Sequence, residues 1–197
     1  MATSLFSKIH DKVARAGIDK KSKESREWFI KNLKNIRNIS RTAILNDPTV
    51  INMKKPLIGR MFMFFYDPKA KDTLPYYDEF PLILMVGPAP GGFYGLNLHY
   101  LSPRLRAIFF DELMGHLNND KYDETTRFRL TYNTLQQSRK LRMFAPCFKH
   151  YLFKNVKSKT SEVLPSEWEI AMFLPTDSFV GADRQAIWKE TRQFSMK

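Results

Sequence analysis

Two short apolar runs separated by a loop of glycine and proline constrain the fold of this chain more than any other feature. Residues 82–86 (LILMV) are apolar on both faces, and residues 93–101 (FYGLNLHYL) alternate between two faces. Both patterns are typical of β-strands. The glycines of residues 87–92 (GPAPGG) permit positive φ, and the prolines stiffen the loop. No helix follows directly, as a phosphate-binding glycine loop requires, so the sequence predicts a β-hairpin.

Helical spacing dominates the first 45 residues. Leu5, Ile9 and Val13 recur every four residues, and a second helix is predicted to start near Ser22. On this second helix the basic residues fall within about 80° of arc, opposite the apolar stripe. Residues 46–56 contain Asp-Pro and Lys-Pro breakers and are predicted to be a linker.

Further elements are predicted downstream of the linker. Residues 59–68 indicate a buried strand, and residues 168–174 alternate like a closing strand. Ser102-Pro103 is a typical helix start, followed by an apolar stripe at Leu105, Ile108, Phe109, Leu113 and Leu117. Pro146 predicts the start of another helix, and residues 181–194 a final amphipathic helix or tail.

These elements predict an α+β protein, with a small curved antiparallel sheet or SH3-like barrel decorated with helices. We expect a basic helical N-terminal segment at residues 1–50 and a single α+β domain at residues 57–197. The chain starts without a long apolar segment of the secretory type and contains no membrane-length apolar run, so we expect a soluble protein without membrane contact.

Basic charge is concentrated in two segments. The net charge is +12, and residues 1–60 hold 14 Lys and Arg against 5 Asp and Glu. Residues 125–161 hold 9 Lys and Arg and no acidic residue. Such clustering favours a polyanionic partner, usually nucleic acid, although a solvated surface or a contact with acidic proteins gives the same composition.

Candidate nucleic-acid contacts are the cations of these two segments. Aromatic residues are interleaved with the cations of the second segment, but aromatics at helical spacing are more often core, so we place them inside. The candidates are Lys23, Arg26, Lys34, Arg37, Arg41, Arg127, Arg129, Arg139, Lys140, Arg142, Lys149, Lys154, Lys157 and Lys159.

Signatures of catalysis are weak. The histidines have no HExxH spacing, and no serine lies in GxSxG. Asp67 and Glu79 could hold Mg²⁺ in a nuclease, but a turn-capping role for Asp67 is favoured. His99 beside Asn97 could shuttle a proton, but an internally bonded histidine is favoured. The single cysteine, Cys147, is expected to be a small buried apolar residue. No cofactor, metal or small-molecule substrate is expected.

Several stretches resemble a family of virion proteins of large contractile-tailed, T-even-like phages. They include GRMFMFFYDPKAKDTLPYYDEFPLIL, GGFYGLNLHYLSPRLRA, YDETTRFRLTY, PCFKHYL and PSEWEIAMFLP, and the resemblance covers about residues 22–174. The chain is similar to the DNA end protector or head-completion type. The resemblance implies a protein of the virion, present in host cytoplasm during assembly, that binds the ends of packaged linear DNA and shields them from exonucleases. It implies no catalytic residues.

Three hypotheses follow. The first is a non-enzymatic virion protein that binds double-stranded DNA through the helix at residues 23–41 and the segment at residues 127–159, alongside other phage virion proteins. The second is a structural baseplate, neck or tail subunit whose basic faces contact acidic virion proteins. The third is a metal-dependent nuclease that uses Asp67 and Glu79.

Overall fold

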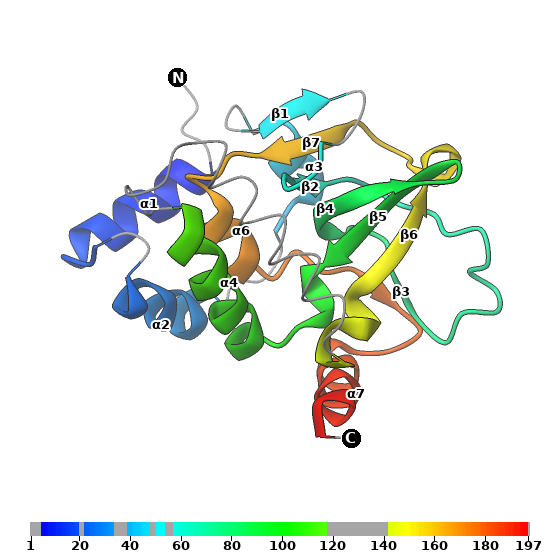
Figure 1. Ribbon diagram of the computed structural model, residues 1–197. Helices are drawn as coiled ribbons and strands as arrows, with labels where there is room; N and C mark the ends of the chain where they lie inside the picture. The colour runs from blue at the N-terminus through cyan, green and yellow to red at the C-terminus, as the bar shows by residue number, and fades with distance from the viewer. Residues whose placement is uncertain are drawn as a thin grey trace.

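The computed structural model describes residues 5–19, 22–33, 39–47, 50–53, 57–117 and 142–196 (Figure 1). The helices are α1 (Leu5–Arg15), α2 (Lys23–Asn32), α3 (Arg41–Leu45), α4 (Pro103–Leu117), α6 (Trp168–Phe173) and α7 (Arg184–Met196). The strands are β1 (Val50–Met53), β2 (Met61–Met63), β3 (Tyr77–Asp78), β4 (Leu82–Ala89), β5 (Gly92–Asn97), β6 (Phe148–Leu152), β7 (Thr160–Val163) and β8 (Phe179–Val180). Short 3₁₀ helices are η2 (Leu98–Tyr100), η3 (Arg142–Cys147) and η4 (Phe153–Asn155).

Six strands form an antiparallel sheet in the order β1-β7-β2-β4-β5-β6, and β3 pairs with β8 in a separate ribbon. The sheet is open: β1 and β6 are its two edge strands, and they do not pair with each other in the described part of the chain. A bridge between Tyr66 and Val156 draws the chain after β6 against the chain after β2. The predicted α+β class is confirmed, with an open sheet rather than a closed barrel.

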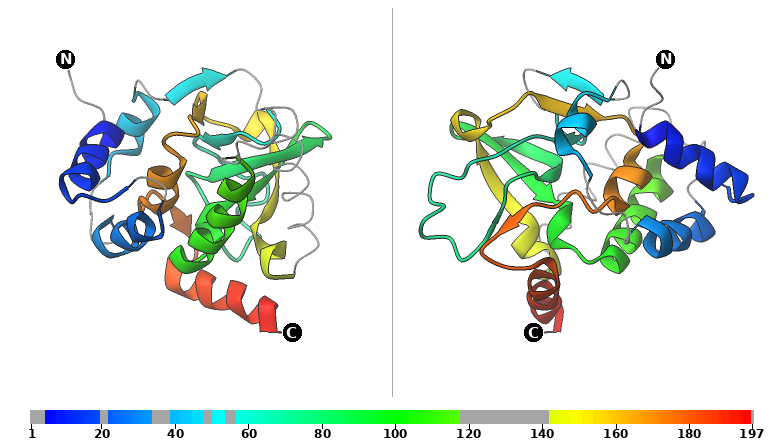
Figure 2. Two further views of the ribbon diagram at one scale, coloured as in Figure 1. Left: turned by 60° about the vertical axis from the view of Figure 1, so that its left-hand side comes forward. Right: turned by 180° about the vertical axis from the view of Figure 1, so that it is seen from behind.

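The sheet separates two apolar clusters. The larger cluster joins one face of the sheet to the helices and includes Phe6 of α1, Phe29 of α2 and Phe110 of α4. The smaller cluster is mostly aromatic and includes Phe62, Phe64, Ile83, Met85, Phe93 and Tyr151. Figures 1 and 2 show α1, α2, α4 and α6 gathered on one side of the molecule and the sheet on the other. Residues before and after the predicted linker therefore contribute to one core. The division of the chain into an N-terminal segment (1–50) and a separate domain (57–197) stays a prediction.

The glycine loop is the turn of a hairpin, as predicted. β4 and β5 pair down to Ala89 and Gly92, and Gly91 takes a φ of 68° in the turn. At Gly92 the backbone of β6 passes so close that an added Cβ would lie 1.8 Å from the carbonyl oxygen of Tyr151. The glycine at this position is therefore required by the packing of β5 against β6.

Serine residues begin two helices as expected. The Ser22 hydroxyl accepts a hydrogen bond from the Ser25 backbone N–H at the start of α2, at 3.0 Å. Ser102 precedes α4, and its carbonyl oxygen accepts from the Arg106 N–H. Ile108 was predicted to lie in the apolar stripe of α4, but it is 57% exposed, and Phe110 is buried instead.

Other local predictions were wrong. Residues 148–152 form strand β6 rather than a helix, because they complete hydrogen bonds along β5. Residues 168–173 form helix α6 rather than a strand, and all of them are buried, so polarity could not show the helical period. Residues 50–53 lie in the predicted linker but form β1, which pairs with β7. The strand predicted at residues 93–101 is shorter than expected: β5 ends at Asn97, and η2 follows it.

No helix among the described residues is long and apolar enough to cross a membrane. The one cysteine, Cys147, is a buried free thiol, and burial raises its pKa to about 12. Its predicted role as a small buried residue is confirmed.

We expect Gly92→Ala to lower the free energy of unfolding by at least about 2 kcal/mol, because the new methyl group overlaps the β6 backbone. Gly87→Ala in the same hairpin is the matched control, since nothing lies within 4 Å of its added Cβ. Urea denaturation checks the pair. Equal unfolding midpoints for the two variants would contradict the close packing of β5 on β6.

Candidate nucleic-acid interface

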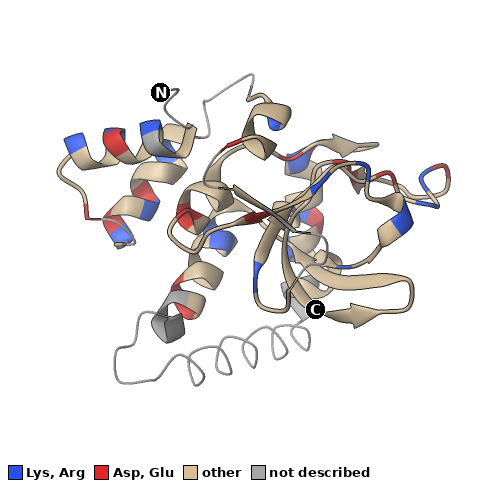
Figure 3. Ribbon diagram, turned by 90° about the horizontal axis from the view of Figure 1, so that it is seen from above, with Lys and Arg blue, Asp and Glu red and all other residues tan. Residues whose placement is uncertain are grey.

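Four of the predicted DNA-contacting lysines lie in one stretch, residues 148–160, which we call the lysine segment. It runs from β6 through η4 to the start of β7 and contains no acidic residue. Lys154, Lys157 and Lys159 are exposed, and Lys149 is half-buried. The Lys157 ammonium lies 3.8 Å from Asp67, which also pairs with Lys71. By contrast, α1 and α2 carry acidic and basic residues side by side (Figure 3).

An aromatic ring lies exposed in the same segment. Phe153 is 46% exposed and makes a tilted contact with Phe93, with ring centroids 5.5 Å apart. Its neighbours Phe144 and Tyr151 are buried, as the sequence predicted for the aromatics of this region. Among the aromatics that the structure describes between residues 142 and 161, Phe153 is the exposed one, and its lysine neighbours are a local signal that could have identified it. An exposed ring among cations can stack on a base while the lysines contact phosphates.

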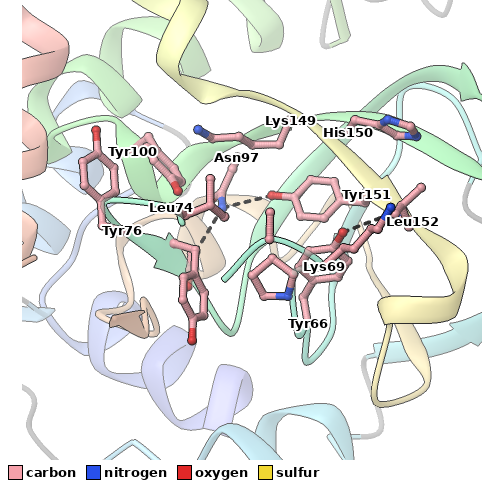
Figure 4. A pocket seen from close by; sticks show the side chains of 14 residues that line it. Tyr66, Lys69, Leu74, Tyr76, Asn97, Tyr100, Lys149, His150, Tyr151 and Leu152 are labelled. Atoms are coloured by element: carbon pink, nitrogen blue, oxygen red, sulfur yellow. Dashed lines mark hydrogen bonds between the residues drawn. The ribbon is translucent and has the colours of Figure 1, made fainter. Parts of the chain in front are cut away.

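A pocket of about 270 Å³ opens between β6 and the loop at residues 67–76 (Figure 4). Five tyrosines line it, together with Lys69, Lys149 and His150. The Lys149 side chain extends toward Tyr100, and its ammonium lies 4.2 Å from the centre of that ring. The pocket thus combines aromatic surface with positive charge. Sequence reasoning missed it, because its lining comes from segments far apart in the chain.

A buried polar cluster lies beneath the pocket. The Asp78 carboxylate accepts hydrogen bonds from Asn97 Nδ2 and from the backbone N–H groups of Phe80 and Ser178, at 3.0–3.1 Å. His99 Nδ1 lies 2.7 Å from the same carboxylate, and His99 Nε2 lies 3.0 Å from the Thr176 hydroxyl. A carboxylate, an imidazole and a hydroxyl joined in this way resemble the hydrogen-bonded triad of a hydrolase, but all three side chains are buried. The cluster acts as a structural joint. His99 is hydrogen-bonded inside the protein as expected, but it lies in η2 and not on the face of a strand.

Electrostatics explain how this carboxylate stays charged. Burial acts to raise the pKa of Asp78, but attraction to the His99 ring and hydrogen bonds from His99, Asn97 and Ser178 outweigh that effect. The pKa of Asp78 therefore lies below its usual value. The ionised carboxylate stabilises the folded state at neutral pH.

Comparison with known families identifies the chain. The sequence model of the family described as "Phage T4 terminal DNA protecting protein" matches residues 1–192. The chain belongs to this family. No curated protein and no solved structure matches the chain. The predicted resemblance to a DNA end protector of a T-even-like phage is confirmed.

The N-terminal candidates that the structure describes, Lys23, Arg26 and Arg41, differ in their surroundings. Helix α2 ends at Asn32, and Ser40 begins a separate helix, α3. Lys23 is exposed, but Arg26 is 8% exposed and pairs with Asp111 and Glu169. Arg26 is therefore removed from the proposed surface, because it is buried and the carboxylates of exposed Asp111 and buried Glu169 compensate its charge. A helical wheel could not show this, since both carboxylates belong to distant segments.

Arg41 also has internal partners. Its guanidinium donates to the carbonyl oxygens of Thr176 and Asp177, at 2.9 and 2.6 Å. Arg106 of α4 is fully buried and donates to the carbonyl oxygens of Leu101, Met172 and His99. Arg41 thus ties the chain after α6 to α3, and Arg106 ties α6 itself to η2 and the start of α4.

Several candidates lie outside the described residues: Lys34, Arg37, Arg127, Arg129, Arg139 and Lys140. For Arg142 the structure describes the backbone, in η3, but not the side chain. Among the residues that the structure does describe, no three His, Cys, Asp or Glu side chains are grouped to hold a metal ion. Asp67, one of the two carboxylates of the nuclease hypothesis, pairs with Lys71 and Lys157.

Asp78→Asn should lower the free energy of unfolding by about 3 kcal/mol at pH 7, because several buried donors lose a charged acceptor. The contribution of Asp78 is fully present above its unfolded pKa of about 3.9 and is lost as pH falls through its lowered folded value. The difference between the two proteins should therefore shrink below about pH 4. Urea titrations from pH 7 to pH 3 measure this, with exposed Asp72→Asn as control. A pH-independent difference would refute the charged state of Asp78.

Arg26→Ala should cost about 3 kcal/mol of stability, since it removes a cation from the buried carboxylate of Glu169. Exposed Lys23→Ala on the same helix should change stability by less than about 0.5 kcal/mol. Thermal and urea unfolding compare the two. Equal stability would mean that Arg26 is not a structural residue.

Proposed function

We propose that this protein binds the ends of linear double-stranded DNA and shields them from exonucleases, without catalysing a reaction itself. The lysine segment makes the phosphate contacts. The observation that carries the proposal is the grouping of Lys149, Lys154, Lys157 and Lys159 with exposed Phe153 in a stretch free of acidic residues. The family of terminal DNA protecting proteins supports DNA as the partner.

Phosphate contacts alone do not distinguish an end from the interior of a duplex, since every phosphate presents the same charge. An end differs by its exposed terminal base pair. Phe153 offers a flat apolar surface next to the lysines, and such a surface can stack on that base pair. The protein would act in the virion, and in host cytoplasm during assembly, in contact with other virion proteins.

Competition binding tests the proposal. At about 100–150 mM salt, a short blunt-ended duplex competes with a covalently closed circle of equal mass concentration, and a processive exonuclease then digests the linear DNA. We expect preferential binding to the linear species and slower digestion of it. Equal binding to both would replace end recognition by a general duplex surface. Binding to neither would favour a structural subunit whose basic faces contact acidic virion proteins.

The triple variant Lys154→Gln, Lys157→Gln, Lys159→Gln should reduce the slope of log affinity against log salt by about 2–3, at roughly 0.9 per lost phosphate contact. The control has the same change in net charge: Lys8→Gln, Lys12→Gln, Lys189→Gln, at exposed lysines of α1 and α7. Its slope should stay close to that of the wild-type protein. Equal slopes for the two triple variants would remove the lysine segment from the interface.

A further inference from the structure

The pocket beside β6 contains a lysine whose ammonium is partly removed from solvent. Lys149 is half-buried, and burial lowers its pKa. No carboxylate lies within ion-pair distance of it in the described part of the chain. Its ammonium instead lies over the face of Tyr100. A half-buried ammonium of this kind gains most from an anion that enters the pocket.

The carboxylates around the pocket are already engaged. Asp78, which lines it, accepts the hydrogen bonds of the buried cluster. Glu190 accepts a hydrogen bond of 2.8 Å from the Tyr76 hydroxyl. Asp67 pairs with Lys71 and Lys157. Lys149, with exposed Lys69 at the edge of the pocket, is therefore the group available to contact an incoming anion.

Two aromatic walls of the pocket are fixed by hydrogen bonds. The Tyr151 hydroxyl accepts from Asn97 Nδ2 at 3.2 Å, and the Tyr66 hydroxyl accepts from the Leu152 backbone N–H at 3.1 Å (Figure 4). Tyr76 and Tyr100 contact each other, with ring centroids 6.0 Å apart. A site that is formed in advance loses little affinity to the ordering of side chains.

We propose that this pocket receives the terminal nucleotide of one DNA strand, unpaired from its complement, with its phosphate on Lys149 and its base against the tyrosine rings. A planar base with an attached phosphate matches the combination of aromatic surface and cation. The volume of about 270 Å³ lies just below the usual range of ligand pockets, about 300–1,000 Å³, so the pocket suits one nucleotide rather than a stacked pair. The inference rests on the proposed function and specifies the site at which an end is held.

The test uses deoxyadenosine 5′-monophosphate, titrated calorimetrically into the full chain, with inorganic phosphate and deoxyadenosine as separate arms. We expect the nucleotide to bind at least about tenfold tighter than either part. Lys149→Gln should weaken nucleotide binding by roughly tenfold or more, as loss of a charged hydrogen bond does. Lys149→Arg should retain most of the affinity. Lys12→Gln on α1 has the same charge change and should bind like the wild type.

A second binding experiment, with duplex DNA, tests whether the pocket contributes to the binding of DNA ends. A duplex with a mismatched terminal pair should bind a few-fold tighter than a fully paired one, because its last nucleotide is already free. Lys149→Gln should abolish that difference, and Lys12→Gln should keep it.

The outcomes separate the two proposals. Absence of nucleotide binding, or equal loss in Lys149→Gln and Lys12→Gln, overturns the pocket inference. Inorganic phosphate that binds as tightly as the nucleotide also overturns it, because the site would then be a simple anion site. If wild-type protein still prefers linear DNA in these cases, end binding stands without the pocket. If it binds linear and circular DNA equally, the proposed function itself fails.

Discussion

The carboxylate of Asp78 joins segments that no local interaction could hold together. It lies at the end of β3 and receives donors from β5, η2 and the chain that follows α6. The Asn97 and His99 donors are buried and the Ser178 N–H is partly buried, so each would cost free energy if it were left without an acceptor. One ionised group satisfies them all, and its charge is retained because those donors surround it.

The same joint determines the shape of the surface above it. Asn97 donates both to Asp78 and to the hydroxyl of Tyr151, and so couples the buried cluster to β6. Strand β6 in turn places Lys149 toward the pocket and continues into the exposed turn of η4. The close contact of Gly92 with the β6 backbone holds this strand against β5. The candidate interface is therefore built on the rigid edge of the sheet, and its geometry follows from interior packing.

Local chemistry determined what the sequence could predict. The hairpin at residues 87–92 and the helix starts at Ser22 and Ser102 depend on neighbouring residues alone, and they were predicted correctly. Residues 148–152 and 168–173 were assigned wrongly, because an available strand edge and complete burial decided their structure. The predicted α+β class was nevertheless correct, because it depends on the presence of both helices and strands and not on the assignment of each segment.

The same distinction applies to the candidate site. The absence of acidic residues in the lysine segment is a local signal, and it identified cations that the structure exposes. Arg26 lies on a helix whose sequence mixes basic and acidic residues, and two carboxylates distant in the chain pair with it. The pocket was beyond prediction, since Tyr76, Asn97 and Lys149 meet only in the folded chain.

Recognition of a DNA end requires two kinds of contact that are seldom supplied by the same residues. Cations give affinity for any stretch of duplex, and their contribution is the same at an end as in the middle. Preference for an end must come from groups that bind what the interior of the duplex hides, namely the face of the last base pair or a base released from it. In this chain Phe153 and the tyrosine-lined pocket adjoin the lysines along β6 and the turn that follows it. In the proposed interface, exposed lysines alone would give general polyanion binding, whereas Phe153 and the tyrosine rings beside them would supply the contacts that favour termini.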